Sequence, residues 1–178
     1  ISEILYDDSL SNYPEYLEIY NPGNKDISLA NYRISEGVEY VFETPAIIHA
    51  KEAIIITSDK IKFSQFQGQV FQWTDGKLKN EGERILLFDK DGILVDFVNF
   101  DNKAPWPPVN MLGGKSIELI SANLDNHFGS NWKYSETTGG SPGSFTEISN
   151  ADQVQNSSFK LRPQPASDWV ELEFEHSV

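Results

Sequence analysis

The stretch EYLEIYNPGNKDISLANYRIS, residues 15–35, says more about the fold class of this chain than any other segment. In YLEIY, residues 16–20, apolar and polar side chains alternate, so we expect Leu17 and Ile19 to face a core and Glu18 to face solvent. An Asn-Pro-Gly break follows at residues 21–23, and NYRIS then resumes a strand-like pattern. The stretch therefore predicts two β-strands separated by a turn.

Short runs of the same character recur along the chain, with Gly, Pro, Asn and Asp between them. We expect strands at residues 2–6, 16–20, 32–34, 38–42, 53–57, 84–88, 93–100 and 116–120. Strands at such regular spacing are typical of an all-β sandwich or barrel. AIIIT at residues 53–57 and RILLF at residues 84–88 are apolar on both faces, which predicts central strands that are covered on each side.

The segment DKDG, residues 89–92, predicts a tight hairpin in which Asp91-Gly92 supplies the positive φ angles of the turn. A single short helix is expected at about residues 59–67, with Ser58 or Asp59 as its N-cap. The predicted fold class is thus all-β, a sandwich with one short helix.

Composition narrows the classes of partner. The chain has 178 residues, 14 basic against 27 acidic side chains and a net charge of -13. Because nucleic acid is bound mainly through Lys and Arg, we expect no nucleic-acid partner. Cysteine is absent, which excludes disulfides and thiolate metal sites. No apolar run approaches the ~20 residues of a membrane-spanning helix, so no membrane span is expected.

The character of the chain changes after residue 145. TEISNADQVQNSS, residues 146–158, is polar and unpatterned, so we predict a sandwich domain at 1–146, a linker at 147–158 and a further segment at 159–178. Within residues 169–175, apolar side chains alternate with glutamates. We expect this strand to pair with a neighbouring edge, either on its own sandwich or on a second copy of the chain, and in the latter case to form a homodimer.

Several ordered segments resemble one family, the lamin tail domain, over about residues 1–145. They are SEI (2–4), YLEIYNPG with NYRIS (16–35), AIIHAKEAIIITSD (46–59), LKNEGERILLFDKDGILVDFV (78–98), SIELI (116–120), GSNW (129–132) and GGSPG (139–143). Glu43 replaces a common proline, and Lys51-Glu52 replaces a turn that usually contains Gly. The resemblance implies an immunoglobulin-like sandwich that acts as an interaction platform. It implies no catalytic residues, and in bacteria it implies a secreted or surface protein, often one that also carries a nuclease or other enzyme.

A second resemblance covers the end of the chain. FKLRPQPASDWVELEF, residues 159–174, is similar to the start of the C-terminal sorting domain of the type IX secretion system, whose hallmark is YPNPA before an amphipathic strand. Arg162 and Gln164 replace the usual Tyr and Asn, and the chain stops short of a whole sorting domain. The resemblance implies export and attachment or release at the cell surface.

Two groups of acidic residues are candidate cation sites. Asp89 and Asp91 resemble the start of a calcium loop, but Ile93 and the residues after it supply no further oxygen ligands, so the hairpin interpretation is preferred. Asp125-Asn126-His127 and Asp101-Asn102 lie in loops that would converge at one end of a sandwich. Such residues more often bond their own backbone. We therefore assign no metal and no cofactor, with calcium as the alternative.

The sequence gives only weak signals for a catalytic site. His49, His127 and His176 show no paired ligand spacing and no arrangement with a nucleophile. Carboxylates are numerous enough for a glycosidase pair, but an acidic surface provides them in any case. We predict that the chain is not an enzyme. The alternative to be tested is that it is a metal-dependent enzyme.

Tryptophans in turn-rich segments are the remaining candidates for a binding surface. Trp73 and Trp132 fall within the family-like segments and are expected in the core. Trp106, flanked by Pro105, Pro107 and Pro108, is the candidate exposed ligand contact.

Together these observations predict a non-catalytic interaction or adhesion module of a secreted or cell-surface bacterial protein. It would tether a larger protein to an envelope component, a polymer or a protein partner. The alternative is a carbohydrate-binding sandwich, accessory to a hydrolase or nuclease, that uses Trp106.

Overall fold

The computed structural model describes residues 1–43, 46–108, 113–145, 159–161 and 172–174. The chain divides into two compact units, Ile1–Thr146 and Glu147–Val178. No helix in these described stretches is long and apolar enough to cross a membrane.

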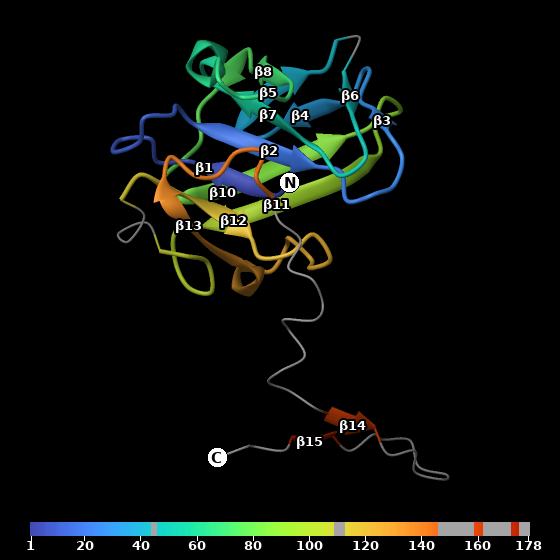
Figure 1. Ribbon diagram of the computed structural model, residues 1–178, viewed down its shortest axis with the longest axis vertical. Helices are drawn as coiled ribbons and strands as arrows, with labels where there is room; N and C mark the ends of the chain where they lie inside the picture. The colour runs from blue at the N-terminus through green and yellow to red at the C-terminus, as the bar shows by residue number, and fades with distance from the viewer. Residues whose placement is uncertain (44–45, 109–112, 146–158, 162–171, 175–178) are drawn as a thin grey trace. The chain divides into compact units, whose positions relative to one another are not determined.

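The first unit is built from two main β-sheets (Figure 1). The larger runs in the order β13, β12, β1, β2, β7, β8, and its strands are β1 (Glu3–Leu5), β2 (Tyr16–Tyr20), β7 (Ala53–Thr57), β8 (Val70–Gln72), β12 (Lys115–Leu119) and β13 (Trp132–Thr138). The smaller runs in the order β11, β10, β4, β5, β9, and its strands are β4 (Arg33–Ser35), β5 (Val38–Val41), β9 (Asp75–Gly76), β10 (Gly82–Phe88) and β11 (Leu94–Asp101). A separate short pair joins β3 (Ile27–Ser28) to β6 (Ile47–Ile48).

The core confirms the predicted all-β sandwich. Leu17 and Ile19 of the larger sheet are buried in one apolar cluster with Ile85 and Val98 of the smaller sheet. Neighbouring strands pair antiparallel, except that β7 and β8 run parallel. The strands expected at residues 16–20 and 53–57 have those bounds in the structure.

The two strands predicted to be covered on both faces, β7 and β10, differ in how deeply they are buried. In β7, Ile54, Ile55 and Ile56 are all buried, so the prediction is confirmed there. In β10, Leu86 and Phe88 are only partly buried, so the prediction is wrong for this strand. The outer face of β10 is covered by single side chains instead of a layer: the Arg33 guanidinium lies 4.5 Å from the centre of the Phe88 ring.

Short or polar strands were not expected from the sequence: β3, β6, β8, β9 and β13. β13, with the sequence WKYSETT, is the longest of them and pairs with β12 from Lys115↔Thr138 to Leu119↔Trp132. Its pattern is too polar to signal a strand by itself, and it is ordered by cross-strand pairing.

The predicted helix is a 3₁₀-helix at Lys60–Phe63, shorter than expected. Asp59 is its N-cap, since its carboxylate accepts a hydrogen bond from Ile61 N at 3.0 Å. A second 3₁₀-helix, Gly129–Asn131, was not expected. The hairpin at residues 89–92 is confirmed, but only Gly92 has positive φ, at 79°. Asp91 avoids it because the Asp89 carboxylate accepts bonds from Asp91 N and Ile93 N and closes the turn.

In the second unit, β14 (Phe159–Leu161) pairs antiparallel with β15 (Leu172–Phe174). Residues 172–174 of the predicted 169–175 strand therefore have a partner within the same unit. The expected pairing with the sandwich or with a second copy of the chain stays a prediction. The two strands lie close together in sequence, so their pairing costs little closure entropy. The remaining residues of the predicted strand lie outside the described part of the chain.

Candidate functional site: a pocket between the two sheets

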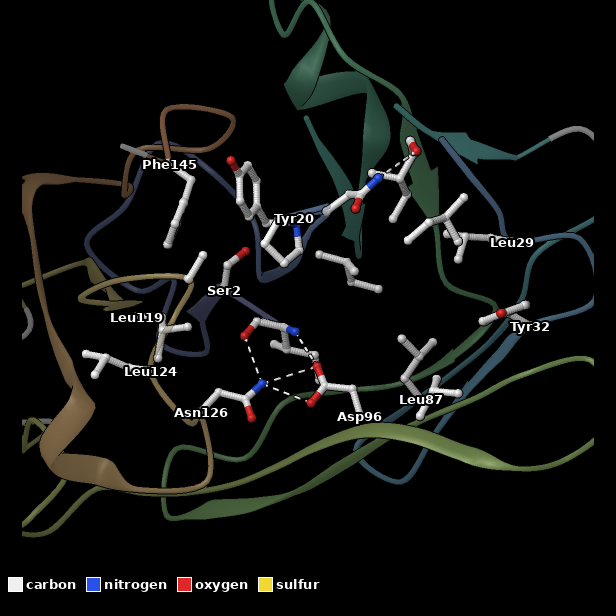
Figure 2. A pocket seen from close by; sticks show the side chains of 18 of the residues that line it. Ser2, Tyr20, Leu29, Tyr32, Leu87, Asp96, Leu119, Leu124, Asn126 and Phe145 are labelled. Carbon is white, nitrogen blue, oxygen red and sulfur yellow. Dashed lines mark hydrogen bonds and ion pairs between the residues drawn. The ribbon is translucent and has the colours of Figure 1, made fainter. Parts of the chain in front are cut away.

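A pocket of ≈ 430 Å³ in the first unit takes residues from both sheets (Figure 2). Its volume is within the range of pockets that hold small ligands or single side chains of a partner. Most of its wall is apolar, contributed by Ile19, Leu29, Ile48, Leu87, Leu119 and Leu124. The arrangement is suited to an apolar group that enters from solvent.

One side of the pocket carries a polar cluster (Figure 2). The side-chain amide of Asn126 donates to both carboxylate oxygens of Asp96, at 3.0 and 3.2 Å, and to the Ile1 carbonyl at 3.1 Å. The nitrogen of Ile1 also contacts Asp96. Trp132 Nε1 donates to the Asn126 carbonyl at 2.9 Å, which fixes the backbone that carries the amide. Asp96 and Asn126 are therefore held in place before any ligand arrives.

Asn21 organises the wall on which the Asn-Pro-Gly turn lies. Its side chain accepts a bond from Gly23 N at 2.9 Å and donates to the carbonyls of Lys25, Ile48 and His49 at 2.8, 3.3 and 3.2 Å. These bonds connect the turn after β2 to the β6 region. Asn21 is buried, so the turn is a rigid part of the pocket wall.

An aromatic pair forms a further part of the wall. Phe145 packs on Tyr20 with ring centroids 4.6 Å apart. The segment that leads to Phe145 is hydrogen-bonded to buried carboxylates of the larger sheet: Ser141 N donates to Glu3 at 2.9 Å and Gly143 N donates to Glu18 at 2.6 Å. The position of Phe145 thus depends on these two acids.

These bonds overturn one expectation. Glu18 was expected to face solvent, but it is buried, with 1% of its surface exposed. The outward face of β2 is covered by the chain around residues 139–144, so alternation places Glu18 under a second layer. Burial raises the pKa of Glu18, and burial together with the neighbouring Glu18 charge raises the pKa of Glu3 to about 8.

The three tryptophans in the described part of the chain are interior. Trp73 and Trp132 are buried, as predicted. Trp106 is buried too, with 7% of its surface exposed, so the expectation that it is an exposed contact is wrong. Its ring packs against Trp132 with centroids 5.5 Å apart, and Gly129 lies against it closely enough that a Cβ there would clash.

The loops expected to converge do not do so through the predicted residues. Asn126 contacts Asp96, which is five positions from Asp101 along β11, or roughly 16 Å in an extended strand. Asp125 instead pairs with His127, whose backbone and ring nitrogens both bond its carboxylate and lower its pKa. No group of three or more His, Cys, Asp or Glu side chains among the described residues is placed to hold a metal ion.

Other candidate residues have ordinary structural partners. His49 Nδ1 lies 2.8 Å from Asp26 at an exposed position. Lys77 and Lys79 form a basic pair in the segment DGKLKN, residues 75–80, and lie 3.7 and 3.4 Å from Glu15 and Glu83, so acidic neighbours offset both cations. His176 lies outside the described residues.

The site residues that sequence reasoning missed are Asn21 and Asp96, whereas Asn126 was named only as a candidate cation ligand. Asp96 carried the clearest signal, because it is a carboxylate inside the otherwise apolar run ILVDFV, residues 93–98. A charged residue in such a run needs a polar partner. Its partners are far away in sequence, so only the fold identifies them.

Comparison with known proteins gives a single result that bears on this geometry. The family model described as Lamin Tail Domain matches residues 1–102, which hold β1 to β11 and most of the pocket wall. No curated protein matches the chain.

Proposed function

This chain belongs to the lamin tail domain family, and from that premise we propose that it is a protein-interaction module whose binding site is the pocket between its sheets. The domain of this family is immunoglobulin-like and generally a non-catalytic interaction module. The proposal adds the place of binding and the class of partner.

The pocket is the observation that carries the proposal. Interfaces draw most of their binding energy from a few apolar or aromatic side chains that fill pockets of the partner. Here an apolar wall is rimmed by half-exposed apolar residues, since Ile27 of β3 and Val95 of β11 are 40% and 49% exposed and both line the opening. An inserted side chain would bury this surface.

The walls are also preorganised. Asn21 and Asn126 each connect segments that are distant in sequence through several hydrogen bonds of their side chains. A rigid pocket loses little conformational entropy on binding, so a larger share of the contact energy contributes to affinity.

We further propose that the module acts at a bacterial cell surface and tethers a larger parent protein there. The support is the resemblance of residues 159–174 to a type IX sorting segment. The net charge of -13 favours basic partners over nucleic acid. The carbohydrate-binding alternative depended on Trp106, whose ring is packed in the interior.

The test is selection from a random peptide library displayed on phage, with the full chain as bait. Ala122, partly buried in the pocket wall, is replaced in the variant Ala122→Trp, which fills the cavity. The matched control is Asn123→Trp, which adds the same ring at the adjacent exposed position outside the pocket.

We expect the wild type and Asn123→Trp to enrich the same apolar-anchored peptides and Ala122→Trp to lose them. Equal enrichment by all three proteins would refute the pocket as the binding site. Binding to a glycan array with no peptide enrichment would favour the carbohydrate-binding alternative.

A further inference from the structure

The pocket is continuous with an unpaired sheet edge. β11 is the last strand of the smaller sheet, and the only described strand that pairs with it is β10. β11 is eight residues long. In an antiparallel pair, alternate residues point their backbone N–H and C=O groups away from the partner, so β11 presents a row of donors and acceptors that another strand can use.

The edge is apolar where it meets the pocket. Ile93, Leu94 and Val95 are 62%, 44% and 49% exposed, and Val95 lines the opening. Natural edges are usually protected by Lys, Pro or a bulge. Residues 93–101 contain no Lys or Pro. The register shifts between the pairs Leu87↔Asp96 and Phe88↔Leu94, so Val95 has no direct partner on β10, and Val95 also lines the pocket.

The surroundings of the edge are acidic. Asp89 and Asp91 lie in the turn before β11, Asp96 and Asp101 lie within it, and Asp125 lines the pocket. The nearby cation Lys90 is already paired, 2.7 Å from Asp91. Loop residues 121–131 contact β11 through side chains, with Asn126 bonded to Asp96 and the His127 ring 3.8 Å from that of Phe97. The partner that complements this edge carries positive charge.

We propose that β11 receives an extended, basic segment of a partner protein as an added β-strand, with one apolar side chain of that segment seated in the pocket. The inference rests on the proposed function and names its binding mode. Main-chain bonds to the edge supply affinity and the pocket selects the anchor residue, as in other cases of strand addition.

The probe is a capped pentapeptide, Lys-Val-Ile-Val-Lys, titrated into the ¹⁵N-labelled full chain and followed by NMR. Two modified versions of this peptide, called twins, carry N-methyl groups on alternate peptide amides. The first twin is methylated on one alternating set of amides, and the second twin on the other set. A third twin has Glu in place of both Lys residues. Leu94→Lys tests the edge, and Ile61→Lys is its control at a 76% exposed site on the 3₁₀-helix Lys60–Phe63.

Strand addition uses only one alternating set of peptide amides. One N-methyl twin should therefore bind roughly tenfold or more weakly, because two or three hydrogen bonds are lost, while the other binds like the parent peptide. The Glu twin should bind about tenfold more weakly at low salt, and the difference should shrink as salt rises. Amide–amide Overhauser contacts should connect the peptide to β11. Leu94→Lys should weaken binding, and Ile61→Lys should not.

Two outcomes would refute strand addition or its basic partner without refuting the proposed function. If Ala122→Trp abolishes binding but both N-methyl twins bind like the parent peptide, the pocket is a binding site and strand addition is refuted. If the parent pentapeptide does not bind although the library yields pocket-dependent peptides, a basic extended segment is the wrong partner. Absence of any pocket-dependent peptide refutes the proposed function itself.

Discussion

Glu3 of β1 and Glu18 of β2 are direct cross-strand partners, and both are buried. Like charges at such positions repel, so the pair is stable only if a proton is retained. Tyr16 and Ser116 donate hydroxyl hydrogen bonds to Glu3 at 2.6 and 2.5 Å, and Ser2 donates to Glu18 at 2.7 Å. The larger sheet thus carries a polar layer on the face that points away from the core.

Stability should fall as the pH rises from about 4.5 to about 8. Burial, and then the Glu18 charge, raise the pKa of Glu3 from 4.5 to about 8 in the folded chain. Over this range the folded state binds a proton that the unfolded chain has released, so the free energy of unfolding decreases with pH. Urea unfolding between pH 5 and pH 9 measures it.

Glu3→Gln should flatten this dependence, because it keeps the shape of the side chain without the titration. Glu81→Gln, at an exposed position, is the control. An unchanged pH profile in Glu3→Gln would show that Glu3 is not the group responsible.

Gly140→Ala should destabilise the chain by more than about 2 kcal/mol. Gly140 has φ of 84°, and a Cβ there would collide with the Tyr16 hydroxyl and the Glu3 carboxylate. Gly92→Ala is the matched control, with φ of 79° and no atom within 4 Å of the added Cβ. It should cost only the backbone strain, about 1 kcal/mol. Equal losses in urea unfolding would show that the crowding at Gly140 does not contribute.

Trp106→Ala should cost about 3–5 kcal/mol, because it opens a cavity beside Trp132. Phe128→Ala removes an aromatic ring that is 60% exposed and should change stability by no more than about 0.5 kcal/mol. Thermal and urea unfolding compare the two variants. A neutral Trp106→Ala that alters ligand binding would instead restore Trp106 as a contact residue.

The tail should cause self-association. Among the described strands β14 and β15 pair only with each other, and a two-stranded hairpin is marginally stable alone and can pair further at its outer edges. We expect sedimentation velocity to show a dimer for residues 1–178 and a monomer for residues 1–146. A dimer of the shorter chain would place the interface on the first unit.

Strands with a clear apolar pattern were predictable from the sequence, and the short or polar strands were not. Residues 16–20 and 53–57 have clear apolar patterns, and both strands have the expected bounds. β13 and the short strands are paired by neighbours that are remote in sequence, which no local pattern reports. The site was harder to predict, because Asp96 and Asn126 become partners only when β11 packs beside the 121–131 loop.

Local alternation and turn residues by themselves determined that this chain forms a β-sandwich, with Leu17 and Ile19 in its core and a turn at residues 89–92. Only the tertiary structure decided what covers the face of each strand that points away from the core. Side chains alternate between the two faces of a strand, so Glu18 lies on the face opposite Leu17. Whether that face meets water or another segment depends on residues 139–144, which are more than a hundred positions away in sequence. The same holds for Trp106, whose local sequence permits exposure and whose burial is set by Gly129 and Trp132.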